Sequence, residues 1–307
     1  MGGFVSYLEK ISATKVRERS EKFFDHFSQA RLFYDSQTEI EKDHIVSAFR
    51  FELGKVEVPE IRERMVTILN QVDPQLAERV AAGLGLNPAI KPLKPLNQSV
   101  PADGNPADFQ PRENKKALKP SPELSIVRSG LEHGSARTRK VAILTADGCD
   151  HADLDRVVRT LAVAGAQAKL VAPRLGYLQT MEGKSVKVHF SLLTASSVLF
   201  DAVYVPGGDQ SVALLMKDPC AREFVFEAYK HAKAIAASGS AAHLFQAAGV
   251  LNGSNTPDEA VVVTEKGSSE EVMSRFIAAI EKHRNWEREK TLRVDLQPVS
   301  APTRKSA

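Results

Sequence analysis

Apolar residues between positions 36 and 86 recur every third or fourth position, a spacing that predicts amphipathic helices. Ser36–Glu39 supplies N-cap residues for a first helix, while Pro59 and Pro74 suit the first turns of two more. The apolar stripes are, in chain order, Ile40, Ile45, Ala48, Phe49 and Leu53, then Ile61, Met65, Ile68 and Leu69, then Leu76, Val80 and Leu84. Because so few short helices bury little surface, we expect residues 15–86 to be loosely held without another surface to pack against.

The periodic pattern stops after residue 86. Eight of the sixteen prolines fall between Pro88 and Pro122, and no helical or strand pattern surrounds them. Residues 87–137 are therefore predicted to form a semi-extended, mostly unstructured Pro-rich linker. The part before the linker, residues 1–86, is predicted to be a small all-α segment.

Between residues 138 and 290, short apolar runs alternate with helical stretches. The predicted strands are Val141–Leu144, Ala168–Ala172, Ala202–Val205, Ala234–Ala237 and Val261–Val263, with Val186–Phe190 in a hairpin or excursion. The predicted helices are Leu154–Ala164, Phe224–His231, Ala241–Ala247 and a closing amphipathic helix, Ser269–Arg288. Strands that are apolar throughout and alternate with helices predict an α/β fold with a doubly wound, mostly parallel sheet. Residues 291–307 are predicted to be a disordered tail.

Composition narrows the function classes. A chain of 307 residues with 43% hydrophobic content is long enough for two folded units. Its 41 basic and 38 acidic residues leave a net charge of +3, too weak a field to favour nucleic acid as a partner. The sequence has two cysteines and no apolar run of the roughly 18 residues that cross a bilayer. We therefore predict a soluble, cytoplasmic protein that binds neither nucleic acid nor membrane.

Candidate ligand-binding loops follow from the predicted sheet, because doubly wound sheets bind ligands beside the carboxyl ends of their strands. The loops at these ends are Ala146–Asp150, Gly207–Gln210 and Ala237–Ser240, and we expect them to converge on one rim. Gly207–Gly208 lacks the spacing of a phosphate-binding loop, so it is expected to turn the chain sharply beside a neighbouring loop. The eight histidines are dispersed, and no metal site is predicted.

Three segments at these strand ends resemble class I amidotransferases and PfpI-type intracellular proteases, namely Ala142–Gly148, Asp201–Gly208 and Ala234–Gly239. Active members of that superfamily carry a cysteine nucleophile at a strained strand-to-helix elbow, usually followed by a histidine. Ala237 stands in the place of the cysteine and Ser238 in that of the histidine, and the acidic partner of the thiol has no recognisable counterpart. Because an alanine side chain cannot be deprotonated, covalent catalysis by the familiar route is excluded.

Other interpretations of this edge stay open. Either Ser238 or Ser240 acts as an unconventional nucleophile with His243 as its base, or these serines cap the helix that follows. Cys149 is either a redox centre or a small buried hydrophobe, and we favour the second.

The helical segment resembles another family. Its blocks Lys15–Phe23, Phe27–Tyr34, His44–Leu53 and Ile61–Met65 are similar, in this order, to the helical tail that follows the haem barrel of large-subunit catalases. That family continues with a proline-containing linker and a flavodoxin-like, amidotransferase-like domain with a degenerate nucleophile site. The resemblance therefore covers essentially the whole chain and implies the C-terminal part of such a catalase.

For the parent family, the resemblance implies haem-dependent breakdown of hydrogen peroxide under oxidative stress. A distal histidine and asparagine, and a proximal tyrosine paired with an arginine, perform this reaction upstream of the helical tail. Arg31 precedes Tyr34 by three residues, whereas the family's tyrosine motif has a spacing of four, so Tyr34 is predicted to be a packing aromatic. No catalytic, haem-binding or metal-binding residue is assigned to this chain.

We therefore predict a non-catalytic portion of a large-subunit catalase that binds no haem itself and serves subunit assembly or stability. Its expected partners are a catalase haem-barrel domain or the subunits of a homotetramer. One alternative is a freestanding PfpI-like amidase or deglycase with an unconventional nucleophile. Another is a holdase-like binding module that uses the apolar helix faces of residues 1–86.

Overall fold

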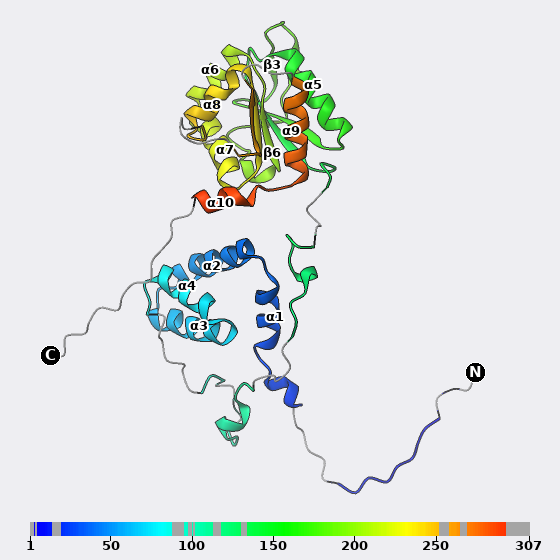
Figure 1. Cartoon of the computed structure of the whole chain (residues 1–307), viewed down its shortest axis with the longest axis vertical. Coiled ribbons are helices and arrows are strands. Elements are labelled where there is room, and N and C mark those ends of the chain that lie inside the picture. The colour runs from blue at the N-terminus through cyan, green and yellow to red at the C-terminus, as the bar shows by residue number, and fades with distance from the viewer. Residues whose placement is uncertain are drawn as a thin grey trace, which may run out of the picture. The chain divides into compact units, whose positions relative to one another are not determined.

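The structure is a computed structural model of the 307-residue chain (Figure 1). It describes residues 3, 5–13, 20–87, 95–97, 100, 102–112, 118–129, 134–251, 258–264 and 269–292. The chain forms two compact units, of which the first takes in Met1–Ser125 and the second is Ile126–Asp295. Within the described residues, no helix has both the length and the apolar character needed to cross a membrane.

The described elements of the first unit are all helical, and α2, α3 and α4 correspond to the three predicted helices. In chain order they are η1 (Glu21–Phe24), α1 (Ser28–Ser36), α2 (Glu39–Gly54), α3 (Pro59–Val72), α4 (Pro74–Leu84), η2 (Pro106–Phe109) and η3 (Pro122–Leu124). Thr38 begins α2 with a reciprocal cap: its N–H donates to the Glu41 carboxylate at 2.8 Å, and its hydroxyl accepts from Glu41 N at 3.4 Å. The cap explains why α2 starts at Glu39.

One apolar core joins α1 to α4, and its most buried members are Val66, Ala77, Val80 and Ala81. The segment around η3 attaches to the same unit. Ser121 N donates to Ser36 Oγ at 2.9 Å, and the Ser125 hydroxyl donates to the Glu41 carboxylate at 2.7 Å. The stretch from Ser121 to Ser125, which lies within the predicted linker, is therefore held against the connection between α1 and α2.

The second unit alternates strands with helices. Its elements are β1 (Lys140–Leu144), α5 (His151–Val163), β2 (Gln167–Ala172), β3 (Tyr177–Gln179), β4 (Ser185–Lys187), β5 (Phe190–Ser191), η4 (Ser197–Leu199), β6 (Ala202–Val205), α6 (Asp209–Lys217), α7 (Pro219–Lys230), β7 (Ala234–Ser238), η5 (Gly239–Ala241), α8 (Ala242–Ala247), β8 (Val261–Thr264), α9 (Ser269–Glu281) and α10 (Trp286–Leu292). The six-stranded sheet has the order β5-β2-β1-β6-β7-β8 with parallel pairings, and β3 pairs with β4 antiparallel. From β2 to β8 this is the flavodoxin-like strand order, which confirms the predicted fold class.

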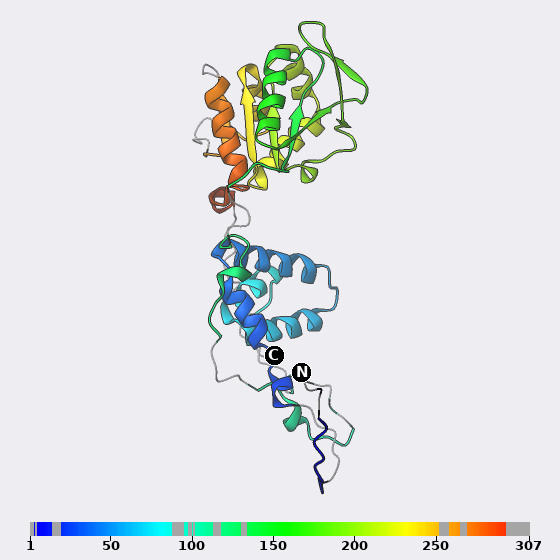
Figure 2. The ribbon, with the colours of Figure 1, turned by 90° about the vertical axis from the view of Figure 1, so that its right-hand side faces the viewer.

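Helices cover both faces of the sheet (Figures 1 and 2). Helices α5 and α9 lie side by side over one face, and α6, α7 and α8 cover the other. In β1, Val141 and Ile143 belong to the core under α5 and α9, whereas Ala142 and Leu144 belong to the core on the opposite face. The uninterrupted apolar strand β1 is therefore covered by helices on both faces, as the sequence predicts.

The closing helix differs from its prediction. Instead of one helix over Ser269–Arg288, α9 ends at Glu281 and α10 begins at Trp286, because His283 adopts a φ of 64° that a right-handed helix does not contain. Helix α6 occupies a stretch in which the sequence predicts no helix. The predicted tail, 291–307, lies outside the described residues except for its first two positions, which end α10.

Arg288 attaches α10 to the rest of the unit. The residue is 2% exposed, and its guanidinium donates to the Asp258 carboxylate from Nε at 2.6 Å and from Nη2 at 2.9 Å. Its Nη1 donates to the carbonyl oxygens of Lys233 at 2.9 Å and Tyr229 at 3.0 Å. The charge is therefore buried with a matched carboxylate and two backbone acceptors.

Candidate functional site

The three loops at the carboxyl edge of the sheet converge, as the sequence predicts. Asp150 N donates to Gly207 O at 2.9 Å, and Gly207 N donates to Ser238 Oγ at 3.0 Å. Gly208 has a φ of 117°, and a Cβ there would overlap Gly148 O and lie 2.8 Å from Cys149 Cα. Gly208, the second glycine of the pair, therefore turns the chain where the loop after β1 approaches too closely for a side chain.

Ala237 lies inside β7 rather than at a strained elbow. Its Cα pairs with Val205 of β6 and with Val263 of β8, and none of its surface is exposed. The positive φ of this strand-to-helix turn, 55°, falls on Gly239. The position that corresponds to the nucleophile in the resemblance is thus a regular strand position in the core.

A buried carboxylate lies beneath the same edge. Asp153, in the first turn of α5, is 5% exposed. Its Oδ1 accepts from the Tyr204 hydroxyl at 2.9 Å, and its Oδ2 accepts from Gly207 N at 3.1 Å and from the Ser238 hydroxyl. Arg156 Nη1 lies 3.4 Å from Oδ1 and balances the charge. We call Asp153, Tyr204, Gly207 and Ser238 the Asp153 network.

The Asp153 network fixes the protonation and orientation of its members. Burial, and then the charge of Asp153, raise the pKa of Tyr204, so its hydroxyl remains a proton donor. The Ser238 hydroxyl donates its one proton to Asp153 and accepts from Gly207 N. These hydrogen bonds connect α5 with β6, with the loop after β6 and with β7, and they hold the three elements together.

His243, the base considered for Ser238, does not accept the hydrogen bond of the Ser238 hydroxyl. Its side chain is exposed on α8, whereas the Ser238 hydroxyl is bound to Asp153, 85 residues away in sequence. Asp153 is not among the candidate residues predicted from the sequence. Its one local signal is an acidic residue in the first turn of a helix, and that position is common because carboxylates stabilise helix N-termini.

Cys149 is fully buried in the core under α5 and α9. Burial raises the pKa of its thiol, which keeps the sulfur protonated. A neutral, enclosed thiol is a poor nucleophile and redox centre, in agreement with the interpretation of Cys149 as a small hydrophobe. Among the residues that the structure describes, no group of His, Cys, Asp and Glu side chains is placed to hold a metal ion.

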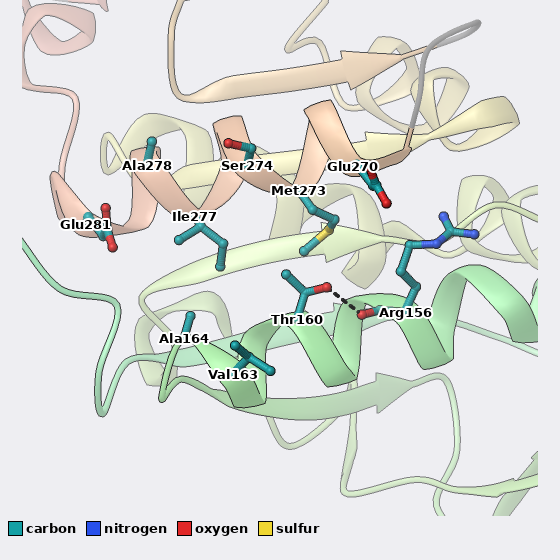
Figure 3. A pocket seen from close by; sticks show the side chains of 10 residues that line it. All are labelled: Arg156, Thr160, Val163, Ala164, Glu270, Met273, Ser274, Ile277, Ala278 and Glu281. Carbon is teal, nitrogen blue, oxygen red and sulfur yellow. Dashed lines mark hydrogen bonds between the residues drawn. The ribbon is translucent and has the colours of Figure 1, made fainter.

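A hollow of about 680 Å³ lies on the outside of the second unit, between α5 and α9 (Figure 3). Figure 3 shows Met273 and Ile277 of α9 pointing toward α5, where the Thr160 hydroxyl donates to Arg156 O at 2.9 Å. Arg156 also reaches Asp153, so this hollow borders the Asp153 network from the helix side.

A second hollow, which we call the helical groove, lies in the first unit and has a volume of about 460 Å³. Apart from Glu52 and the Tyr34 hydroxyl, its lining is apolar. The lining residues are Ala30, Phe33, Tyr34, Ile45, Ala48, Phe49, Glu52, Leu69, Val72 and Leu76. The groove leaves the core of this small unit open on one side.

Comparison with known protein families accounts for both units. The family described as "Catalase-related immune-responsive" matches residues 20–84, and the "C-terminal domain found in long catalases" matches residues 137–290. The chain belongs to the long-catalase family. The resemblance to the C-terminal part of large catalases, drawn from the sequence, is thereby confirmed.

Several long catalases are similar to nearly all of this chain. Catalase HPII of Pseudomonas aeruginosa is 40% identical over 289 residues, which cover 94% of this chain and 37% of that protein. Catalase HPII of Mycobacterium avium is 37% identical over 294 residues, covering 93% of this chain and 38% of that protein. Catalase-2 of Bacillus subtilis is 35% identical over 290 residues, covering 94% and 38%. The chain therefore spans about 38% of the length of these long catalases.

Proposed function

We propose that this chain serves as the non-catalytic C-terminal part of a long catalase and supports subunit assembly and stability by binding a catalase-type haem domain. Breakdown of hydrogen peroxide would belong to that haem domain. The proposal is supported by the relatives, in which the matching part is 37–38% of a protein named catalase. The structural observation that carries it is the helical groove.

The helical groove exposes apolar side chains of the small first unit to solvent. Phe33 at its rim is 48% exposed, and Ala48 on the facing helix is also exposed. Nearby α2 and α3 expose further large apolar side chains, namely Phe51, Ile61 and Ile68. Burial of apolar surface gains about 25 cal/mol per Å², and exposed apolar patches mark interaction sites. We infer that the haem domain of a long catalase covers this groove.

We also propose that the chain holds no haem by itself. Tyr34 lies in a sequence stretch similar to the family's tyrosine ligand motif, but its environment does not suit a haem ligand. It is 5% exposed in the core of the first unit, and its hydroxyl is hydrogen-bonded with Arg79. Burial, and then the charge of Asp73, raise the pKa of Tyr34, whereas ligation of haem iron needs the phenolate.

Co-expression tests the proposed partner. The long catalase of Pseudomonas aeruginosa, shortened by the part that matches this chain, would be produced together with the tagged 307-residue chain. We expect the tagged chain to retain the haem-containing partner through affinity and size-exclusion steps. We also expect the complex to keep its peroxide-degrading activity at temperatures that inactivate the shortened catalase alone.

Two variants of the same helix separate groove binding from other contacts. Ala48→Asp places a charge among apolar residues of the groove and should abolish retention, because a buried carboxylate without a partner is costly. Ser47→Asp, at the adjacent exposed position outside the groove lining, is the matched control and should retain the partner. Failure of the unaltered chain to retain the partner, or equal retention by both variants, would contradict the proposal.

A further inference from the structure

A hollow of about 430 Å³ lies at the carboxyl edge of the sheet, beyond the ends of β1 and β2. The ends of β1 and β2 form its floor, β3 forms one wall, and the end of α6 forms another. We propose that this hollow binds a small organic anion with an apolar or aromatic body. Its volume is typical of small-molecule sites, and the carboxyl edge is where doubly wound sheets bind ligands.

The floor and walls suit an apolar body. Ala146, Ala172 and Leu178 are buried and line the hollow, while Leu214 from α6 is 41% exposed beside them. Tyr177 also lines the hollow, and the residue is 58% exposed. An exposed ring at the edge of an apolar hollow offers a flat surface for an aromatic or short aliphatic group.

Two carboxylates, Asp147 and Asp218, and two cations, Arg174 and Lys217, line the hollow, so its formal charges balance. Both carboxylates that line the hollow are already engaged: Asp147 accepts from Gln179 N at 2.8 Å and pairs with Arg174 at 3.1 Å. Asp218 caps α7 by accepting from Cys220 N at 2.8 Å. Asp147, Arg174 and Asp218 therefore have partners within the protein, and Lys217 is the charged group at the rim that is left for a ligand to pair with.

Lys217 supplies the unmatched charge. It lies in the last turn of α6, is exposed and lines the hollow. Within the described residues, no carboxylate pairs with its ammonium group, whereas Lys230 in the last turn of α7 pairs with Glu227 at 3.1 Å. A carboxylate or sulfonate of the ligand would pair with Lys217, and the apolar part of the ligand would lie over Leu178 and Tyr177.

Benzoate and its neutral isostere benzamide are suitable probes. The full 307-residue chain, with methyl groups of Leu and Val isotopically labelled, would be titrated with each and followed by NMR. We expect benzoate to shift the methyl signals of Leu178, Val188 and Leu214 saturably and to bind more tightly than benzamide. Absence of these shifts up to the solubility limit of benzoate, or equal affinity for benzamide, would overturn the proposal.

Matched variants locate the charge. Lys217→Gln should weaken benzoate binding by about fivefold and leave benzamide unchanged, because one exposed ion pair contributes up to about 1 kcal/mol. Lys230→Gln, in the same place on the next helix, should change neither affinity. Tyr177→Ala should weaken both probes. Equal benzoate affinity in the Lys217→Gln and unaltered proteins would overturn the assignment of an anionic ligand.

Discussion

The hydroxyl of Ser238 donates a hydrogen bond to the carboxylate of Asp153, which lies 85 residues earlier in the chain. This contact joins the end of β7 to the first turn of α5, next to Ala237, which the resemblance to amidotransferases puts in the place of a nucleophile. Because Asp153 also accepts from Tyr204 and Gly207, the polar groups of this edge satisfy one another. We therefore expect these polar groups to stabilise the second unit.

Removal of the Ser238 hydroxyl should destabilise the second unit. Ser238→Ala leaves the buried Asp153 carboxylate and Gly207 N each without one partner, so we expect the free energy of unfolding to fall by about 1–3 kcal/mol. Urea denaturation measures this change. Ser240→Ala on the same turn is the control and should stay within about 0.5 kcal/mol of the unaltered protein. Similar values for the two variants would show that the network carries little stability.

A cysteine introduced at Ala237, the position that corresponds to the amidotransferase nucleophile, should not react with alkylating reagents. In Ala237→Cys the sulfur would enter a fully buried strand position in the core under α6, α7 and α8. We expect no alkylation by iodoacetamide in the native state and a loss of about 1–3 kcal/mol in stability from overpacking. Mass spectrometry checks this, with partly exposed Cys220 as the reactive reference and buried Cys149 as the unreactive one. Rapid native alkylation of the new thiol would contradict the account.

The sequence predicts the sheet because each central strand carries its own signal. Val141–Leu144 is apolar on both faces, and so short an apolar run is typical of a covered parallel strand. Helix α6 is harder to predict because it begins directly after the turn signal Gly207–Gly208, with no side-chain cap. The break at His283 depends on distant contacts, including Asn285 N to Ala232 O at 2.8 Å.

The candidate site is less predictable than the sheet. The convergence of three loops follows from parallel strand order, and the sequence therefore finds the correct edge. The hydrogen-bond donors Tyr204, Gly207 and Ser238 lie 51 to 85 residues from Asp153, in or directly after two different strands, so no local spacing reveals them. The hollow near Lys217 depends likewise on where α6 ends relative to β2, which sequence patterns do not encode.

Lys233 should make stability depend on alkaline pH. It is 4% exposed, its ammonium donates to Ser197 O at 2.5 Å, and burial, followed by the charge of Arg284, lowers its pKa from 10.5 to about 8. Between these two pKa values the unfolded chain binds more protons than the folded one, so Lys233 makes stability rise with pH across this window.

Lys233→Met should remove that rise. The urea midpoints of the two proteins, measured from pH 7 to pH 11, isolate the contribution because other titrating groups are common to both. Lys230→Met, at an exposed lysine, is the control and should follow the unaltered protein. Parallel pH profiles for Lys233→Met and the unaltered chain would refute the assignment.

Arg288 should be a main determinant of the stability of the second unit. Arg288→Met leaves the Asp258 carboxylate without its cation and frees two backbone acceptors, so we expect a loss of about 3–5 kcal/mol. The double variant with Asp258→Asn should be less destabilised than the sum of the single changes, because the unpaired charge is then gone. Chemical denaturation of all four proteins measures the coupling. Strict additivity would show that the two side chains do not act as a pair.

Haem titration of the purified 307-residue chain tests whether this part of a long catalase is non-catalytic by itself. Binding would be followed at the Soret band, and activity with an oxygen electrode after addition of hydrogen peroxide. We expect neither saturable one-to-one haem binding nor oxygen evolution, while the same preparation still retains a shortened long catalase. One equivalent of tightly bound haem together with peroxide-dependent oxygen release would contradict this expectation.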